Sequence, residues 1–159
     1  METKNIIVFL VKEKEFALPL EKVQSIEKVE EISSVENGPD YLQGMADIRG
    51  DLIPVIDGRK LFFDETEGIA ENSRLILLNT EPHSVAILVS AVKEIVSIQD
   101  TQLKKVSFIQ NKRNKYFTGV VHIDERLILF IDPEYFLDAI DSEKQLIQIK
   151  EDLIQAAEN

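Results

Sequence analysis

Hydrophobic residues in this chain come in short runs that are separated by short polar turns. Each half opens with two such runs, at residues 5–11 and 16–20 in the first half and at 74–80 and 85–89 in the second. The turns between the paired runs, KEKE and EPHS, are polar. Apolar runs that are joined by a short polar turn are typical of β-hairpins. The pattern therefore predicts a hairpin at the start of each half.

More strands are predicted after each hairpin. In residues 23–32 and 92–98 the apolar side chains recur at two- or three-residue spacing and many are β-branched, which favours strands. Two further apolar runs then flank a polar turn, GDL at 50–52 and DER at 124–126. About five short strands per half suit a small closed barrel. The expected fold class is all-β, with two five-stranded antiparallel β-barrel subdomains packed together.

The chain also repeats itself. When residues 44–62 are aligned with residues 119–137, six of nineteen positions are identical without a gap. The earlier strands align at a slightly smaller offset, which pairs Val23 with Val92 and Ile26 with Ile95. The identities in the later stretch are Gly44 with Gly119, Ile48 with Ile123, Leu52 with Leu127, Ile53 with Ile128, Ile56 with Ile131 and Asp57 with Asp132. The repeat predicts a domain at residues 1–140 made of two similar subdomains, at about 4–62 and 74–137, with strand exchange between them possible.

Three segments lie outside this repeat. Residues 63–73 are acidic and contain Gly, Ser and Asn, so they are predicted to link the two halves. After Pro133 the apolar residues recur at roughly helical spacing, so the tail at 141–159 is predicted to be an amphipathic helix, either packed on the barrels or free to dock elsewhere. Residues 104–115 are locally basic and are interpreted as a solvated loop, with a contact for an acidic partner as the alternative.

The composition narrows the possible functions. The formal net charge is −11, which argues against nucleic-acid binding because such binding depends on cations that neutralise phosphates. There is no cysteine, which removes disulfides and thiolate chemistry and fits a reducing compartment. The first apolar run is too short for a membrane-spanning helix, and no other run approaches that length. A cytoplasmic protein with no direct membrane insertion is expected.

Few residues suit catalysis or metal binding. His83 falls in a predicted turn, and His122 shares a strand face with Asp124 alone, so two ligands make no convincing metal site. The chain has no Gly-rich phosphate loop, Ser–His pairing or Walker-type lysine. No metal or cofactor is expected.

The repeated aspartates and glycines have a simpler reading than catalysis. Asp57 and Asp132 could be a paired aspartic-protease dyad, but each is more simply explained as the end of a strand whose carboxylate binds the backbone of the next turn. Gly44 and Gly119, at matching positions, are assigned to structural turns in the same way. No catalytic residue is predicted.

Residues 37–62, NGPDYLQGMADIRGDLIPVIDGRKLF, resemble the signature of the CheW-like family of bacterial chemotaxis coupling proteins. That family shows an Asn–x–Pro–Asp–aromatic lead, a Gly, an Arg–Gly turn and a strand with Pro–Val–(Ile/Val)–Asp. The resemblance covers nearly the whole chain, because residues 16–26, 85–98 and 116–137 fit the family as well. The matching signature residues are Asn37, Pro39, Asp40, Tyr41, Gly44, Arg49, Gly50, Pro54, Val55 and Asp57.

The resemblance implies two five-stranded barrels around a shared core and an adaptor without catalytic activity. Such an adaptor joins the cytoplasmic tip of a chemoreceptor, a methyl-accepting chemotaxis protein, to the regulatory domain of the histidine kinase CheA at membrane-associated arrays. Arg49 either organises its turn or contacts a partner carboxylate, and core packing is the alternative role for Val23 and Ile26. The expected protein-binding residues are Val23, Ser25, Ile26, Arg49, Gly50 and Asp51.

The chain departs from the family pattern at three positions. Ser25 stands where many relatives have an acidic residue, Gly58 where leucine is common, and Ser90 where the second half usually has Asp. These departures leave the partner open. The alternatives are therefore a CheW-like adaptor for a different sensory signalling pathway and, more remotely, an unrelated double-barrel enzyme.

Overall fold

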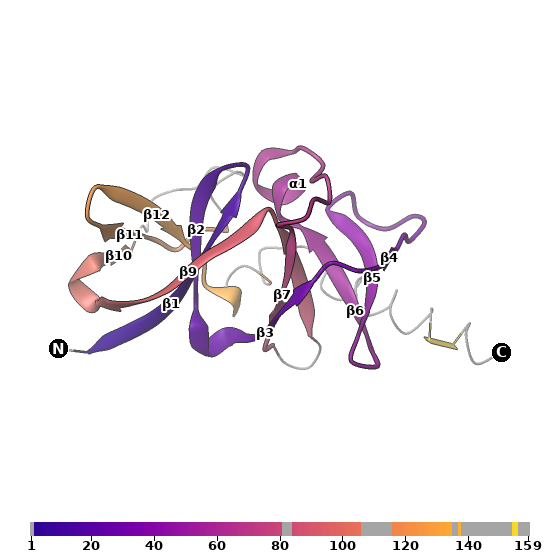
Figure 1. Ribbon diagram of the computed structural model, residues 1–159, viewed down its shortest axis with the longest axis horizontal. Helices are drawn as coiled ribbons and strands as arrows, with labels where there is room; N and C mark the ends of the chain where they lie inside the picture. The colour runs from indigo at the N-terminus through magenta and orange to yellow at the C-terminus, as the bar shows by residue number, and fades with distance from the viewer. Residues whose placement is uncertain (1, 81–83, 106–115, 135–136, 138–153, 156–159) are drawn as a thin grey trace.

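The computed structural model describes residues 2–80, 84–105, 116–134, 137 and 154–155, and these form two six-stranded sheets (Figure 1). We call them sheet 1 and sheet 2. In hydrogen-bonded order, sheet 1 contains β10 (Leu103–Lys105), β11 (Gly119–Ile123), β12 (Arg126–Phe130), β2 (Lys14–Pro19), β1 (Thr3–Val11) and β9 (Ala91–Gln99). Sheet 2 contains β3 (Val23–Lys28), β7 (Arg74–Leu78), β8 (Val85–Val89), β6 (Asp51–Asp57), β5 (Leu42–Ile48) and β4 (Ile32–Ser33).

Each half of the chain gives its first hairpin to the sheet of the other half. The β1–β2 hairpin lies in sheet 1 between β9 and β12, and the β7–β8 hairpin lies in sheet 2 between β3 and β6. The exchange creates two parallel pairs, β12 with β2 and β6 with β8, whereas all other pairs are antiparallel. The described chain therefore passes between the sheets after β2, through the 3-10 turn η1 (Leu20–Lys22), and again between β8 and β9.

The exchanged hairpins are buried on both faces, which explains their continuous apolar runs. In β1, Ile7 and Phe9 pack into a core that also holds Ile76 and Ile87 of sheet 2, so this core lies between the sheets. Ile6 and Val8, which point to the opposite face of β1, pack in a separate cluster with other sheet 1 residues. A third cluster is formed by sheet 2 residues alone.

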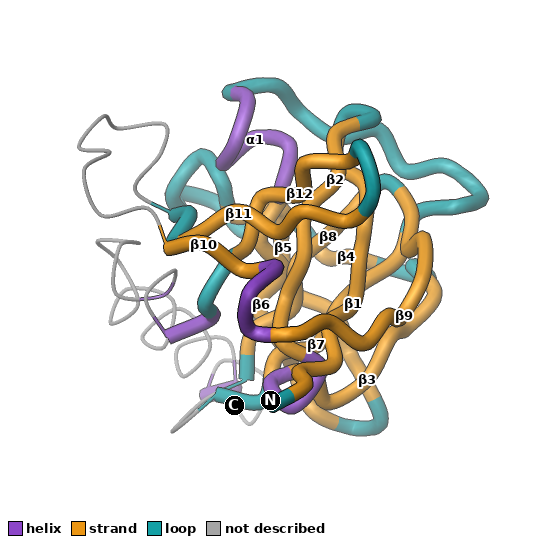
Figure 2. The backbone as a smooth tube through the Cα atoms, turned by 90° about the vertical axis from the view of Figure 1, so that its left-hand side faces the viewer, coloured by secondary structure: helices purple, strands orange, loops and turns teal. Residues whose placement is uncertain are grey.

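The one α-helix among the elements assigned in the described part is α1 (Gly58–Phe63), which follows β6 directly. Figures 1 and 2 show it at the upper end of the molecule. Its residue Phe62 stacks on Phe16 of sheet 1 with ring centroids 4.9 Å apart. Phe16 in turn stacks on Phe9 and Phe117, so a cluster of aromatic rings joins the helix to sheet 1.

The structure confirms that the chain is built mainly of strands in two packed sheets. The predicted strands of each half are present, but each sheet has a sixth strand, β4 or β10, of two or three residues. Residues 63–73 lie between the two halves of the repeat, and because of the hairpin exchange they connect α1 to β7 within sheet 2. Most of the predicted helix at 141–159, most of the basic segment and His83 lie outside the described residues. Closure of each sheet into a barrel stays a prediction.

Candidate protein-binding surface

The β5–β6 hairpin presents Arg49 at the tip of a two-residue turn. Ile48 pairs with Asp51, and the two residues between them, Arg49 and Gly50, have φ angles of +55° and +90°. Positive φ at both central positions matches the right-handed twist of a hairpin. An added Cβ at Gly50 would meet nothing within 4 Å, so the backbone angle and not the space favours glycine there. The Gly50 N–H donates to Asp47 Oδ1 at 2.9 Å, which holds the turn.

Arg49 is held by a carboxylate of its own chain. Its Nη2 lies 3.3 Å from Oε2 of Glu27 on β3. The Arg49 side chain is 74% exposed and that of Glu27 is 23% exposed, so most of the guanidinium faces solvent. Because Glu27 follows Ile26 in β3, this contact brings the Arg49 turn close to the strand that carries the predicted protein-binding residues Val23, Ser25 and Ile26.

The other residues predicted on β3 face in two directions. Ile26 and Val23 lie opposite Ile76 and Leu78, which belong to the core between the sheets. Val23 is half-buried against that core, whereas Ile26 is 39% exposed. Ser25 lies opposite Leu77 on the other face, and its hydroxyl is buried with no hydrogen-bond partner in the described part of the chain. Ile26 is therefore available to a partner, while the Ser25 hydroxyl is not.

The second half supplies a counterpart that the sequence reasoning did not select. Ile95 lies opposite Ile7 on β9 and is 56% exposed, and Val92 packs against the core between the sheets, as Val23 does. Strands β3 and β9 are the outer strands of their sheets and lie on the same side of the molecule in Figures 1 and 2. The repeat alignment, which pairs Ile26 with Ile95, was the signal that could have found it. We call Val23, Ile26, Val92 and Ile95 the edge-strand surface.

An open hollow of about 480 Å³ adjoins the Arg49 turn at the end of sheet 2. Its floor is apolar and includes Met45, Ile48 and Leu75, which are buried. Its rim carries more acidic than basic side chains. The charged rim residues are Glu27, Lys28, Glu30, Glu31, Asp47 and Arg49.

The repeated aspartates bind backbone N–H groups. Oδ1 of Asp57 accepts from the N–H groups of Arg59 and Lys60 at 3.0 and 3.2 Å, and Oδ2 accepts from Glu67 N–H at 3.0 Å. Asp57 thus caps α1 and also holds the segment that follows the helix. Oδ1 of Asp132 accepts from Glu134 N–H at 3.0 Å in the same way.

The repeated glycines lie in strands β5 and β11 and not in the predicted turns, and there they allow strands to approach closely. An added Cβ at Gly44 would lie 2.2 Å from the carbonyl oxygen of Ser33 on β4. At Gly119 it would lie 2.8 Å from the carbonyl oxygen of Lys104 on β10. Both glycines therefore admit the short sixth strand of their sheet.

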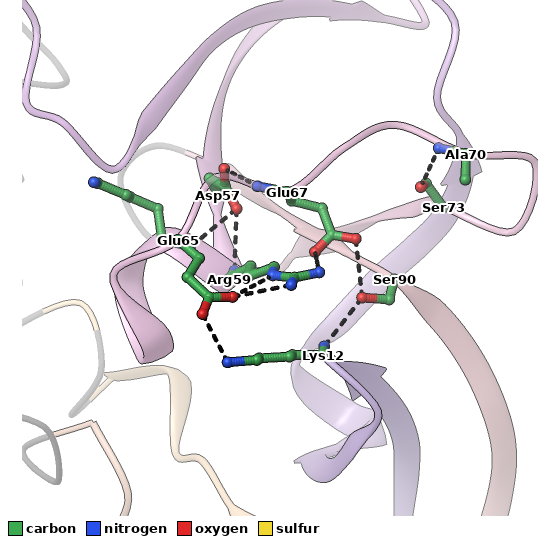
Figure 3. A network of polar contacts seen from close by, with 9 residues as sticks. Lys12, Asp57, Arg59, Glu65, Glu67, Ala70, Ser73 and Ser90 are labelled. Carbon is green, nitrogen blue, oxygen red and sulfur yellow. Dashed lines mark hydrogen bonds and ion pairs between the residues drawn. The ribbon is translucent and has the colours of Figure 1, made fainter.

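A polar network, which the sequence reasoning missed, joins the two sheets near α1 (Figure 3). Glu67 is only 7% exposed, and its Oε1 accepts from the Ser90 hydroxyl at 3.0 Å. Lys12, in the turn after β1, donates its backbone N–H to the same hydroxyl at 3.2 Å, and its Nζ lies 2.7 Å from Oε1 of Glu65. Glu65 also accepts two hydrogen bonds from Arg59. Glu67 lies within residues 63–73, which were predicted only to be a linker.

A second charged cluster covers the end of sheet 1. Arg126 donates two hydrogen bonds to Glu15, at 2.6 and 3.1 Å, and a third to Glu94 at 3.1 Å. Lys93 Nζ lies 2.6 Å from Glu15. The hydrogen bonds from Arg126, together with Lys93, lower the pKa of the Glu15 carboxyl to about 2. This cluster ties β2, β9 and β12 together.

The described part of the chain contains no group of three or more His, Asp or Glu side chains that could hold a metal ion. His122 is exposed on β11. No helix in the same part has the length and apolar character needed to cross a membrane.

Known proteins are similar to this chain in both sequence and structure. The model of the CheW-like domain family matches residues 5–141. The chemotaxis protein CheW of Klebsiella aerogenes is 27% identical over 137 residues, which cover 86% of this chain and 82% of that protein. The CheW of Bacillus subtilis is 26% identical over 141 residues, or 88% of this chain and 90% of that protein. The crystal structure of the scaffolding protein TtCheW from Thermoanaerobacter tengcongensis has the same fold, with a TM-score of 0.75, 25% identity and coverage of 82% of this chain and 89% of that one.

Proposed function

Because the chain belongs to the CheW-like domain family, we propose that it is a non-catalytic adaptor of bacterial chemotaxis. In this role it joins the cytoplasmic tips of chemoreceptors to the regulatory domain of the histidine kinase CheA, and it works in the cytoplasm at membrane-associated receptor arrays. The relatives that it matches over most of its length are chemotaxis proteins, and the similar solved structure is that of a scaffolding protein.

The observation that carries the proposal is the edge-strand surface. Ile26 and Ile95 are large aliphatic side chains that stay exposed on the outer strands of two different sheets. A single exposed apolar residue is ordinary, but the repeat aligns these two residues, and the strands that carry them, β3 and β9, lie on the same side of the molecule (Figures 1 and 2). An apolar surface of this kind suits docking of a partner's aliphatic side chains.

Arg49 fits the role of a second contact. Glu27 engages one nitrogen of its guanidinium, which has five N–H donors, and most of the side chain is exposed. The remaining donors are free to form a forked pair with a partner carboxylate. The two readings of Arg49, turn organiser and partner contact, are therefore compatible.

The arrangement of the aspartates supports an adaptor over an enzyme. Both carboxylate oxygens of Asp57 accept backbone hydrogen bonds, so the atoms that a general acid or base would use are already occupied. We therefore assign Asp57 to capping of α1 and not to catalysis.

Isothermal titration calorimetry with a CheA regulatory domain and, separately, with a receptor cytoplasmic tip from the same organism tests the proposal. We expect the protein to bind both and expect Arg49→Ala to weaken at least one of them about tenfold or more, as central interface arginines do. Arg74→Ala is the matched control, because Arg74 lies on the same sheet and donates hydrogen bonds to the nearby carbonyl groups of Glu71 and Ser73.

Two results would count against the proposal. A folded protein that binds neither partner would indicate an adaptor of the same fold in another sensory pathway. Loss of folding in Arg49→Ala, seen as a lost cooperative unfolding transition, would make Arg49 a structural residue and remove it from the interface.

A further inference from the structure

Ser90 occupies one of the two places where the described chain passes from one sheet to the other. It lies between the last residue of β8 in sheet 2 and the first residue of β9 in sheet 1. Its N–H donates to the Leu10 carbonyl of β1 at 2.9 Å. Its hydroxyl accepts from Lys12 N–H, so Ser90 is bonded twice to the end of the β1 strand.

Glu67 completes the connection from the side of sheet 2. Its Oε1 accepts a hydrogen bond from the Ser90 hydroxyl, and its backbone N–H donates one to Asp57 at the end of β6. A continuous series of hydrogen bonds therefore runs from β6 through Glu67 and Ser90 to sheet 1 (Figure 3). Because Glu67 is buried, the loss of this hydrogen bond would leave a carboxylate with little access to water.

The other oxygen of Glu67 shows why this connection matters. Oε2 is buried and has no hydrogen-bond partner among the described residues, and Arg59 Nη1 lies 3.8 Å from it. Ser90 is thus the single side chain that donates a hydrogen bond to the Glu67 carboxylate among the described residues. The position of this buried charge depends on Ser90.

We propose that Glu67 and Ser90 form a polar latch that fixes the angle between the two sheets. Apolar packing in the core between the sheets is non-directional and holds them together, whereas hydrogen bonds to a buried carboxylate are directional. The latch lies at the α1 end of the junction, where it opposes rotation of one sheet on the other. This deepens the proposed function, on which its relevance to binding rests, because Ile26 and Ile95 lie on different sheets and the latch sets their separation.

Pulsed electron–electron double resonance, which measures the distance between two spin labels, tests the latch on the full chain without any partner. The chain has no native cysteine, so Lys28→Cys on β3 and Ser97→Cys on β9 place one spin label on each sheet at exposed positions. We expect one narrow distance distribution for this labelled protein and a broader or shifted one when Ser90→Ala is added. Ser73→Ala is the matched control, because the Ser73 hydroxyl also accepts a hydrogen bond from a backbone N–H, but from Ala70 in its own loop.

The outcomes separate the latch from the proposed function. A distribution for Ser90→Ala that equals that of Ser73→Ala would overturn the latch, since packing alone would then set the angle. If Ser90→Ala does not fold, Glu67→Met removes the acceptor at similar side-chain length and takes its place with the same expectation. In a third outcome, the distance distribution broadens or shifts in Ser90→Ala as expected while the protein binds neither receptor nor kinase. That result would reject the proposed function and leave the latch in place.

Discussion

Nη2 of Arg49 lies 3.3 Å from Oε2 of Glu27, and this contact joins the tip of the β5–β6 hairpin to the outer strand β3. The two side chains differ in exposure, with the carboxylate mostly covered and the guanidinium mostly in solvent. Exposed ion pairs contribute little to stability. The contact therefore orients an otherwise flexible arginine more than it supports the fold.

Removal of the Glu27 carboxylate should separate these two roles. In Glu27→Gln we expect the free energy of unfolding, measured by urea denaturation, to change by less than about 1 kcal/mol, since the arginine of the pair is open to solvent. Affinity for the partner that contacts Arg49 should fall, because the guanidinium loses its fixed orientation. A loss of several kcal/mol with unchanged affinity would show that the contact serves folding instead.

Gly50 and Gly68 give a direct test of backbone strain. Gly50 has a φ of +90° in open space, so Gly50→Ala should cost about 1–2 kcal/mol of unfolding free energy through the backbone alone. Gly68 is also in open space, but without a positive φ, so Gly68→Ala should be neutral or stabilise by up to about 1 kcal/mol. Thermal unfolding of both variants measures the difference, and equal effects would contradict the assignment of the turn.

Local patterns were sufficient for the strands. Each predicted hairpin is present, because alternating or continuous apolar runs of β-branched residues leave few other folds for segments such as 5–11 and 85–89. The helix α1 was not predicted, because six residues are too few to show a helical period. Its signal was Asp57, whose side chain caps the helix, but an Asp before Gly is equally typical of a plain turn.

Long-range features were harder to predict because they depend on which strands meet. Glu67 and Ser90 are 23 residues apart, and they meet because the β7–β8 hairpin brings the segment before β7 beside the residue that follows β8. A segment with the composition of a linker therefore contains a buried acid. Ile95, by contrast, could have been predicted, since the repeat already aligned it with Ile26.

Acid should weaken the cluster at the end of sheet 1. The pKa of Glu15 is lowered from 4.5 to about 2 in the folded state, so its carboxylate stabilises the fold fully above the unfolded pKa and loses that effect as the pH falls toward 2. The difference in unfolding free energy between the unchanged protein and Glu15→Gln should thus be largest at pH 6 and shrink between about pH 4.5 and 2. Urea denaturation at several pH values measures it.

Glu94→Gln provides the comparison for this cluster. It removes the negative charge that faces Arg126 from Glu94 and keeps the forked pair between Arg126 and Glu15. Its effect should be smaller at every pH. A Glu15→Gln effect that does not depend on pH would show that packing, and not charge, gives Glu15 its contribution.

The edge-strand surface can be tested with three isoleucines of similar exposure. Ile26→Ala and Ile95→Ala should each reduce partner affinity by about tenfold, since buried aliphatic contacts at an interface centre are worth 1–2 kcal/mol or more. Ile69, which is 52% exposed in the loop after α1 and distant in sequence from both strands, is the matched control. Calorimetry with the receptor tip and the kinase regulatory domain gives the affinities, and urea denaturation checks that folding is intact. If only Ile26→Ala weakens binding, the partner contacts sheet 2 alone. If both weaken the same partner, that partner spans the junction between the sheets, and Ile69→Ala should leave its affinity unchanged.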